Sequence, residues 1–257
     1  MAFYAGFDAA IYPGDDSMAW LKSHSNLLWC GYYLAPAPNL AADANSWRGR
    51  RAGLAGKWGM APIYVGQQVR YGASAVSSIL TFNQGCVDGL QAAANAVRDG
   101  FAPDSCLYLD WEDGGALTGD CKAYVSGWLV TVSDRHFAAG LYCSHRLGEA
   151  FAELIGTIKP HLAVRFWCYA VGSTAEHKLE TPIDALPRID PAGCGFSQAS
   201  LWQREQNAWF ELPAGAPHPG QRLVVDINTA ALPDPGAVRV PDPADPADTA
   251  DTPASPG

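Results

Sequence analysis

Residues 106–113 read CLYLDWED, an apolar run that ends in acids two positions apart. Such a run is typical of a buried β-strand that opens into a polar pocket. Because strand side chains alternate between two faces, Asp110 and Glu112 share one face, with Cα atoms roughly 6.6 Å apart at a rise of about 3.3 Å per residue. The opposite face is apolar and suits contact with covering helices. Two carboxylates on one face can have their pKa values pushed apart, which makes the pair a candidate for general acid/base chemistry.

Seven other runs along the chain have the same strand character. Together with residues 106–113 they give eight predicted strands, at residues 3–8, 26–35, 61–69, 106–113, 137–144, 164–170, 198–203 and 222–228. Strands that alternate with helices imply right-handed βαβ units and a parallel sheet. The sequence therefore predicts an α/β fold, a (β/α)8 TIM-type barrel with irregular or missing helices after the sixth strand. The alternative is an open doubly wound sheet, which lacks its usual Gly-rich turn after the first strand.

Helices are predicted between the earlier strands. One starts at the Asp15–Asp16–Ser17 cluster and runs to residue 24, and others cover residues 46–59, 84–100, 119–133 and 146–155. The segment 84–100 is the clearest of them. Its apolar stripe is made by residues at helical spacing, namely Val87, Leu90, Ala94 and Val97.

The composition changes near the C-terminus. From residue 232 the chain is rich in Pro, Asp and Ala, with almost nothing to bury. We therefore expect one barrel domain over residues 1–231 and a disordered tail over residues 232–257.

Charge and cysteine content limit the partners and the compartment. With 17 Lys and Arg against 26 Asp and Glu, the net charge of −9 argues against a nucleic-acid partner. No apolar stretch approaches the roughly 18 residues that cross a bilayer. The chain shows no signal peptide, so we expect a cytoplasmic protein or one exported to the cell envelope by a non-standard route. Its seven cysteines form no CxxC motif, and several lie inside predicted strands, which favours a reducing compartment.

Polar residues collect where the predicted strands end. In barrels of this kind the active site lies at the C-terminal face. Carboxylates or amides end four strands, at Asp8, at Asp110 with Glu112, at Gln203 and at Asp226. Possible sugar-binding side chains lie near other strand ends: Tyr33, Gln67, Tyr142, Trp167, Tyr169 and Trp202. This set suggests glycoside cleavage, in which one carboxylic acid protonates the leaving oxygen and another carboxylate supports the oxocarbenium-like centre.

Each of these side chains also has a structural interpretation. Asp8 can begin a turn and cap the following helix, and Asp226 can start an Asx-turn. The tyrosines and Trp202 can fill the core. The six histidines show no HxH or HExxH spacing and end no strand, so neither a metal site nor another cofactor is predicted.

The ordered set GFDAA (6–10), LYLDWED (107–113), GLYCS (140–144), LWQ (201–203) and VVDIN (224–228) resembles a known family. It is similar to the glycoside hydrolase family 25 lysozymes and, more closely, to their relatives in the glycoside-hydrolase-like domain of unknown function 1906. The resemblance implies a barrel with incomplete helices and cleavage of peptidoglycan between N-acetylmuramic acid and N-acetylglucosamine. It also implies Glu112 as general acid, Asp110 as the partner that positions the reacting N-acetyl group, and Asp8 and Asp226 as supporting carboxylates.

Two classes of function remain open on the sequence. One is a glycoside hydrolase that acts on bacterial cell-wall glycan or a related polysaccharide. The other is a non-catalytic barrel of the cell envelope that binds glycan without cleaving it. In both cases the expected partner is a polysaccharide or peptidoglycan, and we expect a monomer.

Overall fold

A computed structural model of the chain describes residues 2–35, 46–69, 79–158 and 162–237. Its strands are β1 (Tyr4–Asp8), β2 (Leu27–Tyr33), β3 (Gly59–Val65), β4 (Cys106–Asp110), β5 (Ala138–Ser144), β6 (Val164–Tyr169), β7 (His177–Lys178), β8 (Ala199–Glu211) and β9 (Arg222–Ala230). Its α-helices are α1 (Asp15–His24), α2 (Arg51–Leu54), α3 (Phe82–Arg98), α4 (Gly119–Asp134) and α5 (Gly148–Ile158). All eight predicted strands are present, and the two-residue β7 is additional.

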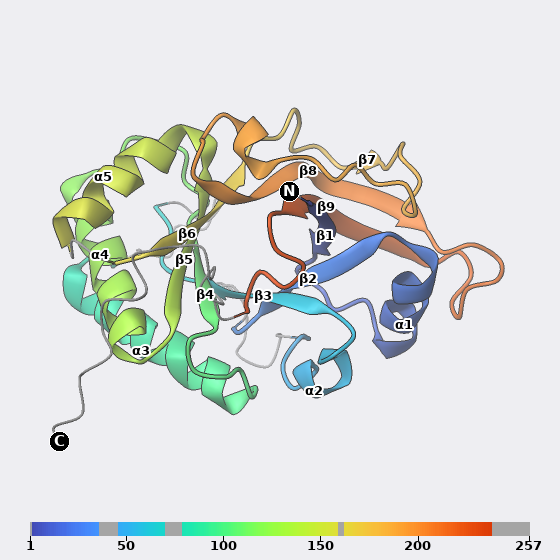
Figure 1. Ribbon diagram of the computed structural model, residues 1–257, viewed down its shortest axis with the longest axis horizontal. Coiled ribbons are helices and arrows are strands. Elements are labelled where there is room, and N and C mark those ends of the chain that lie inside the picture. The colour runs from blue at the N-terminus through green and yellow to red at the C-terminus, as the bar shows by residue number, and fades with distance from the viewer. Residues whose placement is uncertain (1, 36–45, 70–78, 159–161, 238–257) are drawn as a thin grey trace, which may run out of the picture.

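The sheet closes on itself into the barrel seen in Figure 1. Its strands follow the order β6-β5-β4-β3-β2-β1-β9-β8, and β6 pairs with β8 to complete the ring. Strand β7 pairs with β8 alone and lies outside the ring. The predicted fold class, a TIM-type barrel with few helices, is confirmed.

The expectation of an all-parallel barrel is wrong at one strand. Strands β1 to β6 run parallel, but β9 is antiparallel to both of its neighbours, β1 and β8. The reason is the short connection between β8 and β9, over residues 212–221, which turns back as a hairpin instead of crossing over through a helix. In this register Asp8 pairs directly with Asp226.

Four of the predicted helices are confirmed as α1, α3, α4 and α5. The helix predicted over residues 46–59 is reduced to the single turn α2, because Gly49 and Gly56 on either side of it adopt positive φ angles of 77° and 75°. After β6, residues 162–237 contain no α-helix, as predicted. Within the described ranges no helix has the length and apolar character needed to cross a bilayer.

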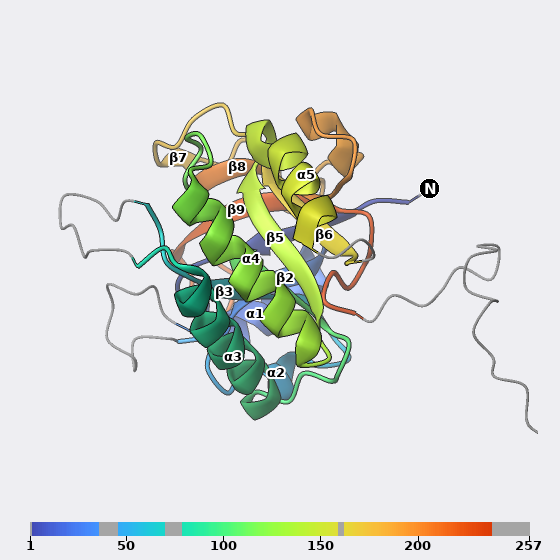
Figure 2. The same cartoon turned by 90° about the vertical axis from the view of Figure 1, so that its left-hand side faces the viewer.

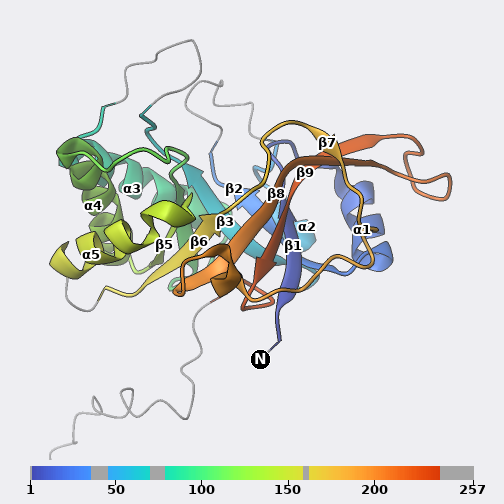
Figure 3. The same ribbon diagram turned by 90° about the horizontal axis from the view of Figure 1, so that it is seen from above.

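The covering helices gather on one side of the barrel, where α3, α4 and α5 lie over the strands in Figure 2. Helices α3 and α4 pack very closely through glycines. A Cβ added to Gly85 would overlap the carbonyl oxygen of Tyr124, and one added to Gly127 would overlap that of Phe82. The opposite side is built by the long β8–β9 hairpin, which extends away from these helices in Figure 3.

The apolar stripe predicted for α3 faces solvent. Val87, Leu90 and Val97 are 55%, 40% and 65% exposed, and Ala94 is exposed as well. The buried face consists largely of small residues, namely Gly85, Asp88, Gly89, Ala92, Ala93 and Ala96. Close packing against α4 requires small side chains, so residue size and not hydrophobicity decides which face is buried.

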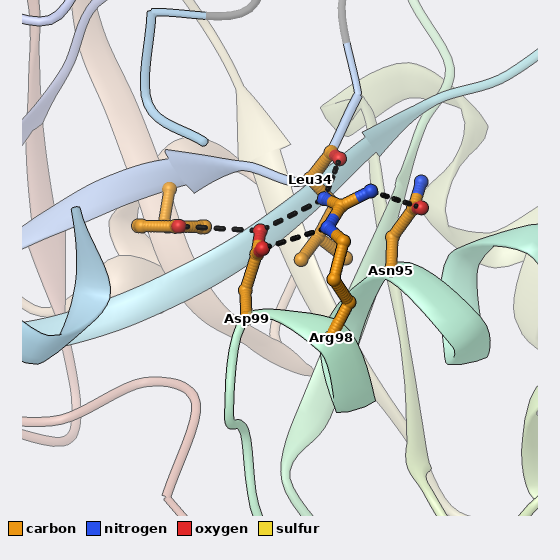
Figure 4. Close-up of polar contacts among 5 residues, drawn as sticks. Leu34, Asn95, Arg98 and Asp99 are labelled. Carbon is orange, nitrogen blue, oxygen red and sulfur yellow. Dashed lines mark hydrogen bonds and ion pairs between the residues drawn. The ribbon is translucent and has the colours of Figure 1, made fainter. Parts of the chain in front are cut away.

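The C-terminal end of α3 is tied to the residues after β2, as Figure 4 shows. The Arg98 guanidinium donates to the Leu34 carbonyl at 3.2 Å and forms a two-point pair with Asp99 at 2.9 and 3.0 Å. It also donates to the Asn95 side chain at 2.7 Å, and Tyr32 donates its hydroxyl to Asp99 at 3.2 Å. This network fixes the helix that precedes β4, the strand that carries Asp110.

The interior of the barrel is filled by aromatic rings. Trp167 packs edge-to-face against Trp29, with ring centres 5.5 Å apart, and against Tyr108 at 5.7 Å. Gly6 and Gly140 leave the space these rings occupy, since a Cβ at either position would collide with Trp29 or Tyr108. The rings form a floor beneath the C-terminal strand ends. Four cysteines predicted to be core are buried and free: Cys30, Cys106, Cys143 and Cys168.

Residues 232–237 close the N-terminal end of the barrel. Asp234 accepts a hydrogen bond from the Met60 backbone at 2.9 Å, and the Gly236 carbonyl accepts one from the Cys106 backbone at 3.0 Å. The Pro235 carbonyl accepts from the Tyr108 hydroxyl and from Arg165. Backbone carbonyls of this Pro-rich segment, which follows the expected boundary at residue 232, therefore satisfy buried donors of the barrel. The rest of the predicted tail lies outside the described residues.

Candidate functional site

Four carboxyl groups meet at the C-terminal end of the parallel strands. Asp8 is the last residue of β1, and Asp226 lies opposite it on β9. Asp110 is the last residue of β4, and Glu112 follows two positions later. All four line a crevice of about 30 Å³, and Asp8, Glu112 and Asp226 also line the groove of about 480 Å³ beside it. The predicted grouping of these acids is therefore present in the structure.

Asp8 is held on both carboxylate oxygens. Tyr33 donates its hydroxyl to one oxygen at 3.0 Å, and the Asn228 amide donates to the other at 2.8 Å. Asn228 is itself fixed by the Trp167 indole, which donates to its carbonyl oxygen at 2.9 Å. Burial raises the pKa of Asp8 well above its usual value, and the nearby charge of Asp226 raises it further. The bonds from Asn228 and Tyr33 oppose this rise without cancelling it.

Asp226 is held from the β8–β9 hairpin. The Gln203 amide donates to one carboxylate oxygen at 2.8 Å, and the Asn207 backbone N–H donates to the other at 2.6 Å. Burial raises the pKa of Asp226 to about 6, against the lowering effect of the Asn207 bond. Burial therefore lets both Asp226 and Asp8 keep a proton to higher pH than a free aspartate does.

Asp110 is the least supported of the four acids. It is 6% exposed, and its Oδ1 atom has no hydrogen-bond partner in the part of the chain described. Burial raises its pKa well above the usual value, and the charges of Glu112, Asp8 and Asp226 add to the effect. A buried acid without donors favours its neutral form.

Glu112 lies at the rim, where its side chain reaches solvent, and partial burial by the surrounding protein raises the pKa of its carboxyl group. Its backbone is held on both sides. The Glu112 N–H donates to the side-chain carbonyl of Gln68 at 2.9 Å, and its carbonyl accepts from the Tyr169 hydroxyl at 2.8 Å. An acid that reaches solvent beside buried acids has the exposure expected of a proton donor to a bound ligand.

Three of the predicted sugar-binding residues line the crevice: Tyr33, Tyr142 and Trp167. Tyr142 packs edge-to-face against Trp167, with ring centres 5.4 Å apart. The rings belong to the aromatic filling of the barrel and also form the wall beside the acids. The interpretation of these rings as core is therefore confirmed, and their contact with a sugar stays a prediction.

The other four predicted binding residues do not line the groove or the crevice. Gln67 turns its side chain away and accepts from the Ile79 backbone. Tyr169 contacts the Glu112 backbone, and Gln203 supports Asp226. Trp202 donates its indole N–H to the Ala170 carbonyl at 3.2 Å. A position near a strand end therefore does not by itself determine whether a side chain faces the groove or the crevice.

Three residues at the site were not singled out from the sequence. Gln206 lines both the crevice and the groove, Asn228 bridges Trp167 and Asp8, and Gln68 contacts the backbone around Glu112. Asn228 had a usable signal, because it follows Asp226 by two positions on a strand and so shares its face. Gln68 and Gln206 had none, since they lie in a loop and in an irregular part of β8.

No group of three or more His, Cys, Asp or Glu side chains within residues 2–35, 46–69, 79–158 and 162–237 has an arrangement suited to a metal ion. The hydrogen-bond donors that hold Asp8 and Asp226 are amides, a hydroxyl and a backbone group. A carboxyl pocket of this kind can transfer protons and stabilise positive charge.

Solved structures with the same architecture come from several bacteria. An uncharacterized protein of B. stearothermophilus has 21% identity and a TM-score of 0.57, over 88% of this chain and 95% of that one. The Tat-secreted protein Rv2525c of Mycobacterium tuberculosis, in complex with L-tartrate, has 15% identity and a TM-score of 0.53, over 91% and 98%. The spore cortex lytic enzyme SleM of Clostridium perfringens has 15% identity and a TM-score of 0.52, over 89% and 67%. At these identities the likeness establishes the fold alone.

Sequence comparison establishes the family. No curated protein matches the chain significantly. The family described as "Rv2525c-like, glycoside hydrolase-like domain" matches residues 20–223, which include Asp110 and Glu112. This agrees with the resemblance at the LYLDWED, GLYCS and LWQ motifs, which lie inside the matched residues. The chain belongs to the Rv2525c-like family of glycoside hydrolase-like domains.

Proposed function

We propose that the protein is a glycoside hydrolase that acts on bacterial cell-wall glycan, with a muramidase-like action on peptidoglycan or a related polysaccharide. The observation that carries the proposal is the meeting of Asp8, Asp110, Glu112 and Asp226 around one crevice, each with a pKa raised mainly by burial. Glycoside hydrolysis uses paired carboxyl groups in unequal protonation states. Membership in a glycoside hydrolase-like family supports the same chemistry.

In this proposal Glu112 protonates the glycosidic oxygen, because it lies at the rim and its raised pKa keeps the proton available at mildly acidic pH. Asp110, two residues before it on the same strand face, assists the reacting group of the sugar. Asp8 and Asp226 stabilise the positive charge that develops at the sugar ring. Tyr33 and Gln206, which line both cavities, contact the sugar.

The nature of the substrate is proposed from two fold neighbours. SleM is a spore cortex lytic enzyme, and Rv2525c is secreted through the Tat route. Both descriptions agree with an action on the bacterial envelope. The groove of about 480 Å³ has the size of a site for a small molecule or for a segment of a longer chain.

One observation favours the second candidate, a barrel that binds glycan without cleaving it. The crevice beside Asp110 measures about 30 Å³, space for little more than a water molecule. A sugar ring seated in the outer groove would therefore reach Glu112 and Asp226 but not Asp110. If Asp110 has to touch the substrate, the barrel binds without cutting until the crevice widens.

The test is an assay for new reducing ends on purified peptidoglycan and on a panel of other glycans. We expect the wild type to release reducing ends and Glu112→Gln to lose at least about a hundredfold in rate, because a positioned general acid contributes roughly 10²–10⁴-fold. Glu153→Gln, an exposed glutamate on α5, is the matched control and should keep full activity.

Binding is measured in parallel on the same glycans. Release that depends on Glu112 supports the hydrolase. Binding without release, unchanged in Glu112→Gln, supports the glycan-binding barrel instead. If the protein neither binds nor cleaves any wall glycan, both candidates are overturned.

A further inference from the structure

Strand β4 ends at Asp110, and the chain that continues to Glu112 is no longer paired with β3. Strands β3 and β4 pair in register only as far as Val65 and Asp110. After Val65 the chain turns away from β4, passing Gly66, where a Cβ would collide with the Tyr124 hydroxyl. Glu112 thus lies beyond the last regular ladder bond on this side.

A glutamine side chain takes the place of the missing strand. The Gln68 amide N–H donates to the Asp110 carbonyl at 2.6 Å, and the Gln68 carbonyl accepts from the Glu112 N–H at 2.9 Å. One side-chain amide therefore makes the pair of bonds that a neighbouring strand would make across Trp111. Gln68 is 2% exposed and does not line the groove or the crevice.

The other edge of the same three residues is also fixed. The Trp111 backbone N–H donates to the Tyr142 carbonyl at 2.9 Å and so continues the β4–β5 ladder, and the Tyr169 hydroxyl donates to the Glu112 carbonyl. The Trp111 ring is 1% exposed and packs under the helices. With both edges held, the chain stays extended past the end of β4, and Glu112 returns to the face of Asp110.

We propose that Gln68 is a positioning residue, a side-chain substitute for a strand that holds the backbone of Glu112 so that its carboxyl group stays at the rim of the groove. The effect of Gln68 on catalysis rests on the proposed function. Its structural consequence, the placement of the Glu112 carboxyl group, can be measured without any substrate.

The first experiment measures the pKa of Glu112 by NMR titration of its carboxyl carbon, assigned by the signal that Glu112→Gln removes. In Gln68→Met both bonds are lost while the side-chain length is kept. The end of the strand then loosens and the Glu112 carboxyl group gains water, so its pKa falls toward the ordinary value. Gln91→Met is the matched control. Gln91 lies on α3 and accepts from the Tyr64 hydroxyl of β3, so its replacement should leave the Glu112 titration unchanged.

The second experiment compares kcat and KM on whichever glycan the wild type cleaves. Gln68→Met should lower kcat by about 10- to 100-fold with little change in KM, since a misplaced acid loses reach to the leaving oxygen. Gln68→Glu is the conservative variant. Its protonated acid can donate and accept as the amide does, whereas its carboxylate cannot donate to the Asp110 carbonyl. The activity of Gln68→Glu relative to wild type should therefore fall as pH rises.

Folding of each variant is checked by its thermal melting transition. If Gln68→Met does not fold, Gln68→Glu is compared with wild type at acidic pH, where both bonds are kept, and at neutral pH, where one is lost. A folded Gln68→Met with the wild-type pKa at Glu112 would overturn the proposal. So would a rise in KM with unchanged kcat, which indicates a role in binding. If the wild type cleaves no glycan, the proposed hydrolase fails while the titration still decides the role of Gln68.

Discussion

Asp110 is the buried acid of the pocket whose Oδ1 atom lacks a hydrogen-bond partner within the described residues. It can be used to test the electrostatics of the site. Its raised pKa means that the folded protein keeps the proton of Asp110 to higher pH than the unfolded chain does. As pH rises above the ordinary aspartate pKa of about 3.9, the unfolded chain ionises first, and the folded state is progressively disfavoured. Asp110 therefore lowers stability at neutral pH and not at acidic pH.

We predict that Asp110→Asn is more stable than wild type at pH 7.5, by about 1–3 kcal/mol, because an amide cannot ionise and the folded state then loses no stability as the unfolded chain ionises. The gain should shrink toward zero near pH 3, below the ordinary aspartate pKa of about 3.9, where Asp110 is neutral in both states. Melting temperatures at the two pH values measure it. Asp184→Asn, an exposed loop aspartate, should show no such gain. An Asp110→Asn protein no more stable than wild type at pH 7.5 would contradict the electrostatic account.

At the same scale, residues that follow the strand period could be predicted from the sequence. The residues that hold them in place could not. Asp110 and Glu112 stand two apart after an apolar run, so their shared face follows from strand geometry. Gln68 belongs to the run 61–69 predicted as a strand, but β3 ends at Val65, so the strand period does not tell which of the following side chains points inward. The choice of Gln67 as a sugar-binding residue fell one position away from the residue that reaches Glu112.

At the scale of elements, strand positions were predictable and strand direction was not. An alternating pattern reads the same in either direction, so β9 gave no sign that it runs antiparallel. Asp226 was nevertheless placed correctly at the mouth, because the pairing of β9 with β1 sets it opposite Asp8. Helix α3 shows the opposite case, in which the element was predicted and its buried face was not.

The buried face of α3 leads to a prediction about glycine. Replacing a helical glycine by alanine ordinarily stabilises by up to about 1 kcal/mol. At Gly85 and Gly127 the new methyl group would overlap a carbonyl of the facing helix, so both Gly→Ala variants should be destabilised despite the better helix propensity. Gly156→Ala on α5 is the matched control, because a Cβ there meets open space.

Chemical denaturation at fixed pH measures these three variants. The expected order of unfolding free energy places Gly156→Ala at or above wild type and both Gly85→Ala and Gly127→Ala below it. Equal stability of all three variants would show that α3 and α4 can separate without loss, and that the size of the buried residues does not determine the helix pair.

At the scale of the whole molecule, the barrel has two different ends and two different sides. Helices α3, α4 and α5 cover one side, and the β8–β9 hairpin extends on the other, as Figures 1 and 3 show. Residues of this hairpin, among them Gln206 and Asp226, line the groove. The acids lie at the C-terminal end above a floor that includes Tyr108 and Trp167. The opposite end is closed by residues 232–237. The site is therefore supported from below by a segment whose composition predicted disorder.

This closure can be tested by two truncations. A chain that stops after Ala231 removes the carbonyls of Pro235, Gly236 and Ala237, which leaves Tyr108 and Arg165 without the acceptors they bond. Each buried donor left unpaired costs about 1–3 kcal/mol, so the loss should amount to several kcal/mol. A chain that stops after Ala237 keeps these bonds. The difference in unfolding free energy between the two truncations isolates residues 232–237, whatever the later residues contribute.

Because Tyr108 packs on Trp167, and Trp167 holds Asn228 and through it Asp8, the shorter chain should also show a changed Asp8 titration by NMR. Equal stability and equal titration in the two truncations would contradict the role of this segment as the closure of the barrel.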